Sequence, residues 1–256
     1  MRARVATDVL VALVALAAVA LGLELWVRAA DVPSYLFPAP SSVLTRLAED
    51  PSFFALEAGV TIVEAAFGFV IGAGAAFAVG ALMAHSRVLE RVLYPLAVLV
   101  KLTPVVAVAP LLTLWFGFGA PPKIAIAALI TFFPMVVNAF VGLRDVDPNE
   151  LAFLQVLAAS RWEIFRALRV PSSLPYLFSG ARISANLALI GAVVGEWTGA
   201  DRGLGRVILV ANATLDLATL FGAVLVLVVI GVAVNVFAST VEGRVLHWHP
   251  TGMQTT

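Results

Sequence analysis

A few polar side chains stand inside long apolar stretches of this sequence, and they are the residues best suited to act on a solute. Lys101 lies about nine residues into an apolar run, and Thr103 and Pro104 follow it closely. Charge inside a membrane is costly, so such residues often line a path for ions or solutes. Proline frees backbone groups and lets a helix bend. The pattern favours a pathway or gate at Lys101, Thr103 and Pro104. A snorkelling lysine beside a static kink is the alternative.

Two carboxylates also lie in or beside apolar runs. Glu196 ends one run near the predicted outer face, where it could line the mouth of a pathway, contact a docking protein or mark the membrane interface. A charge near a helix end is tolerated at low cost, which favours the interface. We keep Glu196 beside Lys101 as a pathway or gate candidate. Glu64 lies inside another run, and its position alone predicts no role.

Several kinds of chemistry are excluded by the sequence. It has no cysteine, and it shows no Ser-His-Asp set, no paired-carboxylate site and no convincing metal-ligand spacing. A P-loop needs Gly-Lys-Ser/Thr, but the two lysines, Lys101 and Lys123, follow Val100 and Pro122. No basic patch of the kind that binds nucleic acid is present. We therefore predict no catalytic residue, no metal ligand and no cofactor bound by this chain.

The elements that must position these residues are membrane spans. Hydrophobic residues make up 61% and charged residues 12% of the 256 residues, and the mean hydropathy is +1.01. A soluble chain is about half apolar and a quarter charged, and a transmembrane helix needs roughly 20 mostly apolar residues. We predict an all-α polytopic membrane protein with about six transmembrane helices. The predicted spans are Asp8–Val27, Gly59–Ala84, Val92–Phe116, Ile124–Leu143, Tyr176–Trp197 and Leu217–Thr240.

Two of these runs leave a choice of interpretation. The first run follows Arg2 and Arg4 and could be a cleaved signal peptide, but its length favours an uncleaved anchor. The second carries small residues at spacings that let helices approach closely, and we favour packing within one subunit over a dimer contact. The residues concerned are Gly68, Gly72, Gly74 and Gly80.

Arginine and lysine are distributed unevenly around the predicted spans. The positive-inside rule favours an orientation with both termini in the cytoplasm. The polar stretch 28–57 then faces outwards, and the stretch 144–174 faces the cytoplasm.

The inner stretch begins like a helix. Asp147 can cap it, Pro148 suits its first position, and Glu150 can complete a capping box. Leucines and Ala158 then recur at three- and four-residue steps, which predicts one apolar face.

The same stretch then turns at small residues and presents aromatic and arginine side chains. Pro171 and Pro175 are expected to end its helical part before the fifth span. Aromatic residues and arginine anchor protein interfaces, so this turn is suited to docking a partner. The alternative is an amphipathic helix that lies on lipid headgroups. The residues of the turn are Ala158, Ala159, Ser160, Arg161, Trp162 and Phe165.

At these residues the sequence resembles a known family. The stretch from Ala159-Ser160-Arg161-Trp162 through Phe165, Pro171, Pro175-Tyr176 and Gly180 to Arg182-Ile183 is similar to the EAA loop of binding-protein-dependent ABC importer permeases. It is closest to the branch for nitrate, sulfonates, taurine and thiamine precursors. Supporting stretches are Leu36-Phe37-Pro38-Ala39-Pro40-Ser41-Ser42-Val43, Leu114-Trp115-Phe116-Gly117-Phe118-Gly119, Phe132-Phe133-Pro134, Val146-Asp147-Pro148 and Gly195-Glu196 to Gly203-Leu204-Gly205.

The resemblance implies a type I importer-like fold in which this loop couples to a separate ATPase. It covers about Leu36 to Trp248, so we divide the chain into 1–35, with the first span and the start of the outer loop, 36–248, the importer transmembrane domain, and 249–256, a tail expected to be disordered. The family's Glu-Ala-Ala is replaced by Ala152-Phe153-Leu154, with Glu150 two residues early, and its glycine by Ala158. Glu64 stands where the branch often has a basic residue.

The function that the resemblance implies is that of a permease subunit in the bacterial inner membrane. The expected partners are two ATP-binding cassette subunits, which carry ATP and magnesium, a second permease copy, an extracytoplasmic solute-binding protein and the lipid bilayer. The solute is expected to be a vitamin or pyrimidine precursor, a sulfonate or a nitrate-like anion. An ion-gradient-driven secondary transporter is the alternative, although no clear inverted repeat supports it.

Overall fold

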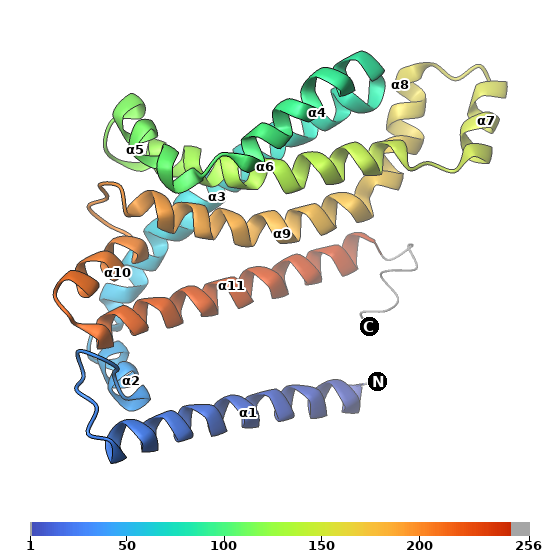
Figure 1. Ribbon diagram of the computed structural model, residues 1–256. Helices are drawn as coiled ribbons and strands as arrows, with labels where there is room; N and C mark the ends of the chain where they lie inside the picture. Colours follow the sequence, from blue (N-terminus) through green and yellow to red (C-terminus); the bar gives the residue numbers. More distant parts are fainter. Residues whose placement is uncertain (1, 247–256) are drawn as a thin grey trace.

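The computed structural model describes residues 2–246, which form helices and connecting turns without a strand (Figure 1). The predicted tail, 249–256, lies outside these residues. The helices are α1 (Arg2–Ala29), α2 (Pro40–Glu49), α3 (Pro51–His85), α4 (Arg87–Leu102), α5 (Val105–Phe116), α6 (Ala120–Arg144), α7 (Pro148–Val156), α8 (Arg161–Ile164), the π-helical turn η1 (Phe165–Arg169), α9 (Val170–Glu196), α10 (Leu204–Ala213) and α11 (Leu217–Val245).

All six predicted apolar runs are helical. α3, α6, the continuous stretch Arg161–Glu196 and α11 are each long and apolar enough to cross a membrane. α1 has 28 residues, which is also sufficient length for a span. In lipid the backbone must satisfy its own hydrogen bonds, which is why an apolar run of this length becomes a helix.

The predicted third span, Val92–Phe116, is not one helix. α4 and α5 meet at an angle of 97°. Thr103 has extended backbone (φ −70°, ψ 122°), and Pro104 begins the next helix as its cap. Proline disfavours helical geometry in the residue before it, so the break falls where the sequence predicted bending.

The predicted end of the helical stretch at Pro171 and Pro175 is wrong. Helix continues without a gap from Arg161 to Glu196, although η1 changes its hydrogen-bond pattern just before Pro171. Pro171 is the second residue of α9, a position at which the missing N–H is tolerated. The fifth span therefore begins as part of the inner loop.

α3, α6 and α9 form the centre of the bundle, and three glycines of α3 allow α6 to approach. A Cβ on Gly72 would lie 2.5 Å from the Ala128 carbonyl oxygen, and one on Gly80 would lie 2.8 Å from Ala139 Cβ. Gly68 faces Ala127 in the same way, whereas nothing lies within 4 Å of a Cβ on Gly74. The predicted packing within one subunit is confirmed for Gly68, Gly72 and Gly80.

The two ends of the molecule are formed by different helices. Figure 1 shows the start of α1, α7, α8 and the end of α11 at one end, and α2, α5 and α10 at the other. α1 stands apart from the bundle and is tied to α2, because Glu24 accepts hydrogen bonds from the Ser41 amide (2.9 Å) and hydroxyl (2.7 Å). The start of α1, the inner loop and the end of α11 therefore share one end of the described part of the chain.

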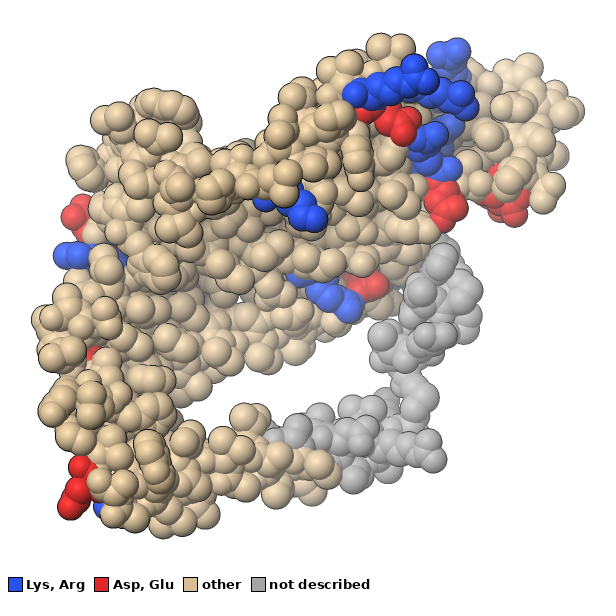
Figure 2. Space-filling view, in the orientation of Figure 1, with Lys and Arg blue, Asp and Glu red and all other residues tan. Residues whose placement is uncertain are grey.

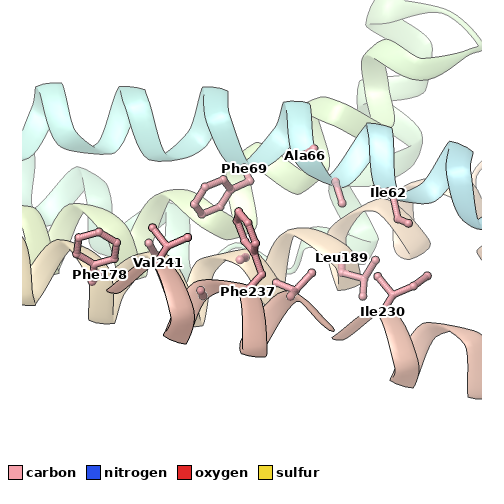
Figure 3. Close-up of a pocket in the computed structure, with 13 residues that line it drawn as sticks. Ile62, Ala66, Phe69, Phe178, Leu189, Ile230, Phe237 and Val241 are labelled. Carbon is pink, nitrogen blue, oxygen red and sulfur yellow. The ribbon is translucent and has the colours of Figure 1, made fainter. Parts of the chain in front are cut away.

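A groove of about 360 Å³ lies between α3, α9 and α11 (Figure 3). All its lining residues are apolar, and Phe69 of α3 and Phe237 of α11 both point into it. Such a lining offers no hydrogen bond to a polar solute. The groove is therefore unsuited to select a small polar solute, and polar sites must be sought elsewhere.

Candidate functional site

The inner loop folds as predicted at its start, with one difference. Asp147 caps α7, because its carboxylate accepts a hydrogen bond from the Asn149 amide at 2.7 Å. The reciprocal bond predicted for Glu150 is not found among the described contacts of α7. The capping box lies one helix later, where the Ser160 hydroxyl accepts from the Glu163 amide (3.3 Å) and the Ser160 amide donates to the Glu163 carboxylate (2.7 Å).

Ala158 holds the turn between α7 and α8 in left-handed geometry, with φ at 56°. The amides of Ala158 and Ala159 donate to the carbonyls of Gln155 and Leu154, both at 3.0 Å, and so close the end of α7. Residues with a Cβ pay about 1–2 kcal/mol for this geometry, which glycine avoids. The turn is thus formed against a local strain at Ala158.

Replacing Ala158 by glycine should tighten this turn. Part of the gain is lost to the greater freedom of glycine in the unfolded chain, which leaves a stabilisation of about 0.5 kcal/mol. Ala158→Val should loosen the turn. Trypsin cleavage after the exposed Arg161 provides the measurement: it should slow in Ala158→Gly and accelerate in Ala158→Val, whereas the same changes at Ala159 serve as controls. Equal cleavage of the Gly and Val variants would contradict the strain.

A row of contacting rings, from Trp162 through Phe165 to His85, connects this turn to the end of α3. Trp162 is 66% exposed and stacks on Phe165, with ring centroids 5.5 Å apart. Phe165 in turn lies 4.9 Å from the ring of His85, the last residue of α3. A force applied to Trp162 from outside the chain would therefore reach a central span through packed rings.

The surface of the loop carries apolar side chains that this chain does not cover. Phe153 is 64% exposed, Val156 85% and Leu157 61%, and Trp162 lies just beyond them. Contiguous exposed apolar side chains rimmed by charge mark sites of interaction. We call residues 147–169 the coupling segment.

Positive charge gathers at the same end of the molecule. Figure 2 shows Lys and Arg side chains concentrated there. A pocket of about 280 Å³ lies between the end of α3 and the coupling segment, lined in part by His85, Arg161 and Arg169. Arg169 also donates to the Leu143 carbonyl at 3.2 Å and so holds the segment against α6. The prediction that this end faces the cytoplasm rests on this excess of positive charge.

Three of the four predicted pathway residues, Lys101, Thr103 and Pro104, lie at the break between α4 and α5, whereas Glu196 lies at the end of α9. Lys101 is exposed in the last turn of α4, with its Nζ 4.8 Å from the centroid of the Phe133 ring. No carboxylate among the described residues lies within 4 Å of it. Thr103 ends α4, and its hydroxyl donates to the Leu99 carbonyl at 2.8 Å. The ammonium group of Lys101 is thus available to a passing solute.

Glu196, at the end of α9, lies in the interior of the chain, so its side chain faces neither lipid nor an open mouth. Its side chain has no exposed area. One oxygen accepts from the Thr61 hydroxyl at 2.7 Å and the other from the Gly205 amide at 2.5 Å. Its position at a helix end suggested the surface, but the turn after α9 folds α10 back over it.

A buried ion pair lies beside Glu196 and was missed by the sequence reasoning. Lys123 Nζ lies 3.0 Å from Glu64 Oε1, and the two side chains are 7% and 4% exposed. Lys123 stands just before the predicted span Ile124–Leu143, but it belongs to the first turns of α6 and is buried. The available signal was the cost of an isolated Glu64 within a span, which calls for a partner.

Three side-chain oxygens accept hydrogen bonds from the first three backbone amides of the turn into α10. Glu57 accepts from the Gly203 amide, Thr61 from the Leu204 amide (2.9 Å) and Glu196 from the Gly205 amide. Unpaired amides at a helix start attract negative groups. A Cβ on Gly205 would lie 2.7 Å from Glu196 Oε2, so only glycine permits this approach. α3 and α9 thus hold α10 jointly.

Comparison with known proteins decides the family. Residues 68–247 match the family model described as "Binding-protein-dependent transport system inner membrane component". The chain belongs to this family. The match covers the coupling segment together with Lys101, Lys123 and Glu196, whereas Glu57, Thr61 and Glu64 lie before it. Family membership sets aside the alternative of an ion-gradient-driven secondary transporter.

Relatives of this permease act in several importers. It is 36% identical over 196 residues to a probable ABC transporter permease protein of Haemophilus influenzae, covering 77% of this chain and 80% of the relative. It is 34% identical to the riboflavin transport system permease protein RibX of Chloroflexus aurantiacus, covering 84% and 81%. It is also 34% identical to the formylaminopyrimidine transport permease protein ThiX of Halalkalibacterium halodurans, covering 84% and 86%.

A solved structure shows the same fold. The MetNI methionine ABC transporter, in inward-facing conformations, matches with a TM-score of 0.61 and 19% identity, covering 79% of this chain and 96% of that one. The predicted all-α, type I importer-like architecture is confirmed. The chain is a membrane-spanning permease subunit of an ABC importer for a small solute.

Proposed function

We propose that this permease is driven by separate ATP-binding subunits that dock on the coupling segment. Support comes from the exposed apolar surface of Phe153, Val156, Leu157 and Trp162 together with the ring chain from Trp162 to His85. An amphipathic helix resting on lipid would not require such a chain. Movement of the ATPase would pull on α3 and, through the continuous helix, on α9.

We further propose that two copies form the translocation pathway in a bacterial inner membrane, with both termini cytoplasmic. The broken span α4–α5 carries many exposed large side chains, among them Leu99, Leu102, Val106 and Trp115. Such a surface is suited to face another copy as well as lipid. A solute-binding protein would deliver the solute at the end that carries α2 and α10.

The solute that we propose is a vitamin or pyrimidine precursor, with sulfonates or nitrate-like anions as the second candidate. Support comes from the relatives named for riboflavin and formylaminopyrimidine transport, and from one named for aliphatic sulfonates. The exposed, unpaired Lys101 favours a solute that carries negative charge or polarisable oxygen atoms.

Co-purification and transport test this function together. In mild detergent the chain should co-purify with a P-loop ATPase encoded beside it. Vesicles that contain both, supplied with the solute-binding protein, should take up its ligand only with ATP and magnesium. Uptake by the chain alone, indifferent to ATP and abolished by an ionophore, would overturn the proposal.

Lys101→Met should lower this uptake while the ATPase still binds. If the ammonium group contributes about 1.4 kcal/mol to a solute in transit, the loss is about tenfold. Lys101→Arg keeps the charge and should retain most of the uptake. Equal uptake by the Met variant and the unchanged protein would show that Lys101 only snorkels.

A further inference from the structure

One oxygen of the buried ion pair has no hydrogen-bond partner. Glu64 Oε1 accepts a hydrogen bond from Lys123 Nζ, but Glu64 Oε2 is buried and has no partner among the described residues. The Glu64 side chain is 4% exposed. Buried polar atoms nearly always have a partner, so an orphan oxygen indicates a bound group that fills the place.

The charges around this oxygen do not balance. Glu64 of α3 pairs with Lys123 of α6, and a Cβ on Gly195, the residue before Glu196, would lie 2.8 Å from Lys123 Cα. Glu196 of α9 also accepts from Thr61, which lies one turn before Glu64 on α3, so the two carboxylates flank the same lysine. Farther out, Glu57 of α3 shares a pocket with Asp201 and Arg206 beside α10. Two ionised carboxylates would leave one uncompensated negative charge in the interior, which costs several kcal/mol.

A cation heavier than a proton does not fit the ligands present. No group of three or more His, Cys, Asp or Glu residues that could hold a metal ion occurs in the described part of the chain. Each oxygen of Glu196 already accepts one hydrogen bond, from the Thr61 hydroxyl and the Gly205 amide, and can accept one more. A proton needs no such shell, because a protonated carboxyl group is itself a hydrogen-bond donor.

We infer that Glu64 and Glu196 hold one proton between them, which makes this cluster a proton-binding site beside the anchor of α10. The proton on Glu64 Oε2 is donated towards Glu196 and gives the orphan oxygen a partner. One negative charge then remains opposite Lys123, and the cluster is neutral. Two carboxylates that share a site behave in this way because they do not ionise together.

The site has a consequence for the outer end of the molecule. Glu196 fixes the Gly205 amide and the Thr61 hydroxyl, and Thr61 fixes the Leu204 amide. Loss of the proton would set two like charges beside these bonds and loosen α10. This inference does not depend on which solute is carried or on how the ATPase docks.

Infrared difference spectroscopy on the full chain in lipid nanodiscs tests whether Glu64 and Glu196 hold a proton. A carboxylic acid C=O band should persist at neutral pH, where exposed carboxyl groups with a pKa of about 4 are ionised. The band should be lost in Glu64→Gln, which imitates the protonated group and keeps the fold. Glu57→Gln, on the same helix and also bonded to the α10 turn, should keep it.

Two results would contradict the shared proton. If the unchanged protein shows no acid band at neutral pH, both carboxylates are ionised and a water molecule serves the orphan oxygen. If the band survives in both Glu64→Gln and Glu196→Gln, the proton lies elsewhere. Either result overturns the inference.

Cysteine labelling tests the effect on α10. The chain has no cysteine, so Asn212→Cys on the exposed side of α10 gives one reactive thiol. As pH rises past the loss of the acid band, labelling should increase more in the otherwise unchanged protein than in the Glu64→Gln background, where thiol ionisation is the same. A constant ratio between the two would contradict the coupling of the proton to α10.

Discussion

Trp162→Asp is expected to stop solute uptake by the assembled importer while the chain still inserts and folds. The indole ring is two-thirds exposed and makes its contacts with Phe165, so the free chain loses little when it is removed. A buried aromatic anchor at an interface contributes about 2 kcal/mol or more, which corresponds to about 30-fold weaker docking. ATP hydrolysis should then proceed without transport, measured as phosphate release against uptake in the same vesicles.

Arg161→Glu should act in the same direction through charge. Arg161 borders the pocket beneath the coupling segment and belongs to the positive end of the molecule. Trp162→Phe keeps a ring that can stack and should retain most of the coupling. Arg202→Glu reverses an exposed charge near α10, at the other end of the molecule, and controls for charge alone. Unchanged uptake in both Trp162→Asp and Arg161→Glu would remove the coupling segment from the mechanism.

The spans could be predicted because lipid leaves the backbone few choices. An apolar run of sufficient length must form a helix; five of the six runs are single helices, and the third forms two, α4 and α5. The bend at Pro104 followed from local sterics, but its angle of 97° did not, because the angle depends on how α5 packs against α6. Local rules thus predicted the position of the break but not the angle between α4 and α5.

Two errors in the coupling segment have local causes. Pro171 and Pro175 were taken as a helix end, yet the helix continues through both, with the π-helical turn η1 just before Pro171. Local π-helical adjustments of this kind let membrane helices tolerate proline. Glu150 was assigned to a capping box on spacing alone, although Ser160 and Glu163 show the same spacing. In both cases the sequence held two acceptable patterns, and tertiary packing selected one.

The buried cluster shows what a single sequence does not contain. Hydropathy gives the depth of Glu64, Lys123 and Glu196 along their helices, but it does not say which face each occupies. Glu64 and Lys123 are 59 residues apart, and they meet only because glycines bring α3 and α6 together. The cost of intramembrane charge predicts that Glu64 has a partner, and the fold is needed to name it.

Lys123→Met is expected to destabilise the chain more than any other single change considered for this protein. Removal of one partner from a buried ion pair leaves an uncompensated charge and costs about 3–5 kcal/mol. Here the uncompensated charge is the single negative charge that Glu64 and Glu196 share. Thermal unfolding followed by tryptophan fluorescence should show the loss.

Two further variants separate charge from packing. Lys101→Met makes the same substitution at an exposed site without an ion pair and should leave the unfolding transition nearly unchanged. In Lys123→Met/Glu64→Leu an apolar pair of similar volume replaces the ion pair, and Glu196 keeps its hydrogen bonds from Thr61 and Gly205. Because such an apolar pair can equal a buried ion pair, most of the stability should return. Failure of the double variant to recover would mean that the lysine stem matters for packing. Gly195 approaches it so closely that a Cβ there would lie 2.8 Å from Lys123 Cα. The contact between α6 and α9, rather than the charge, would then hold this end of the bundle together.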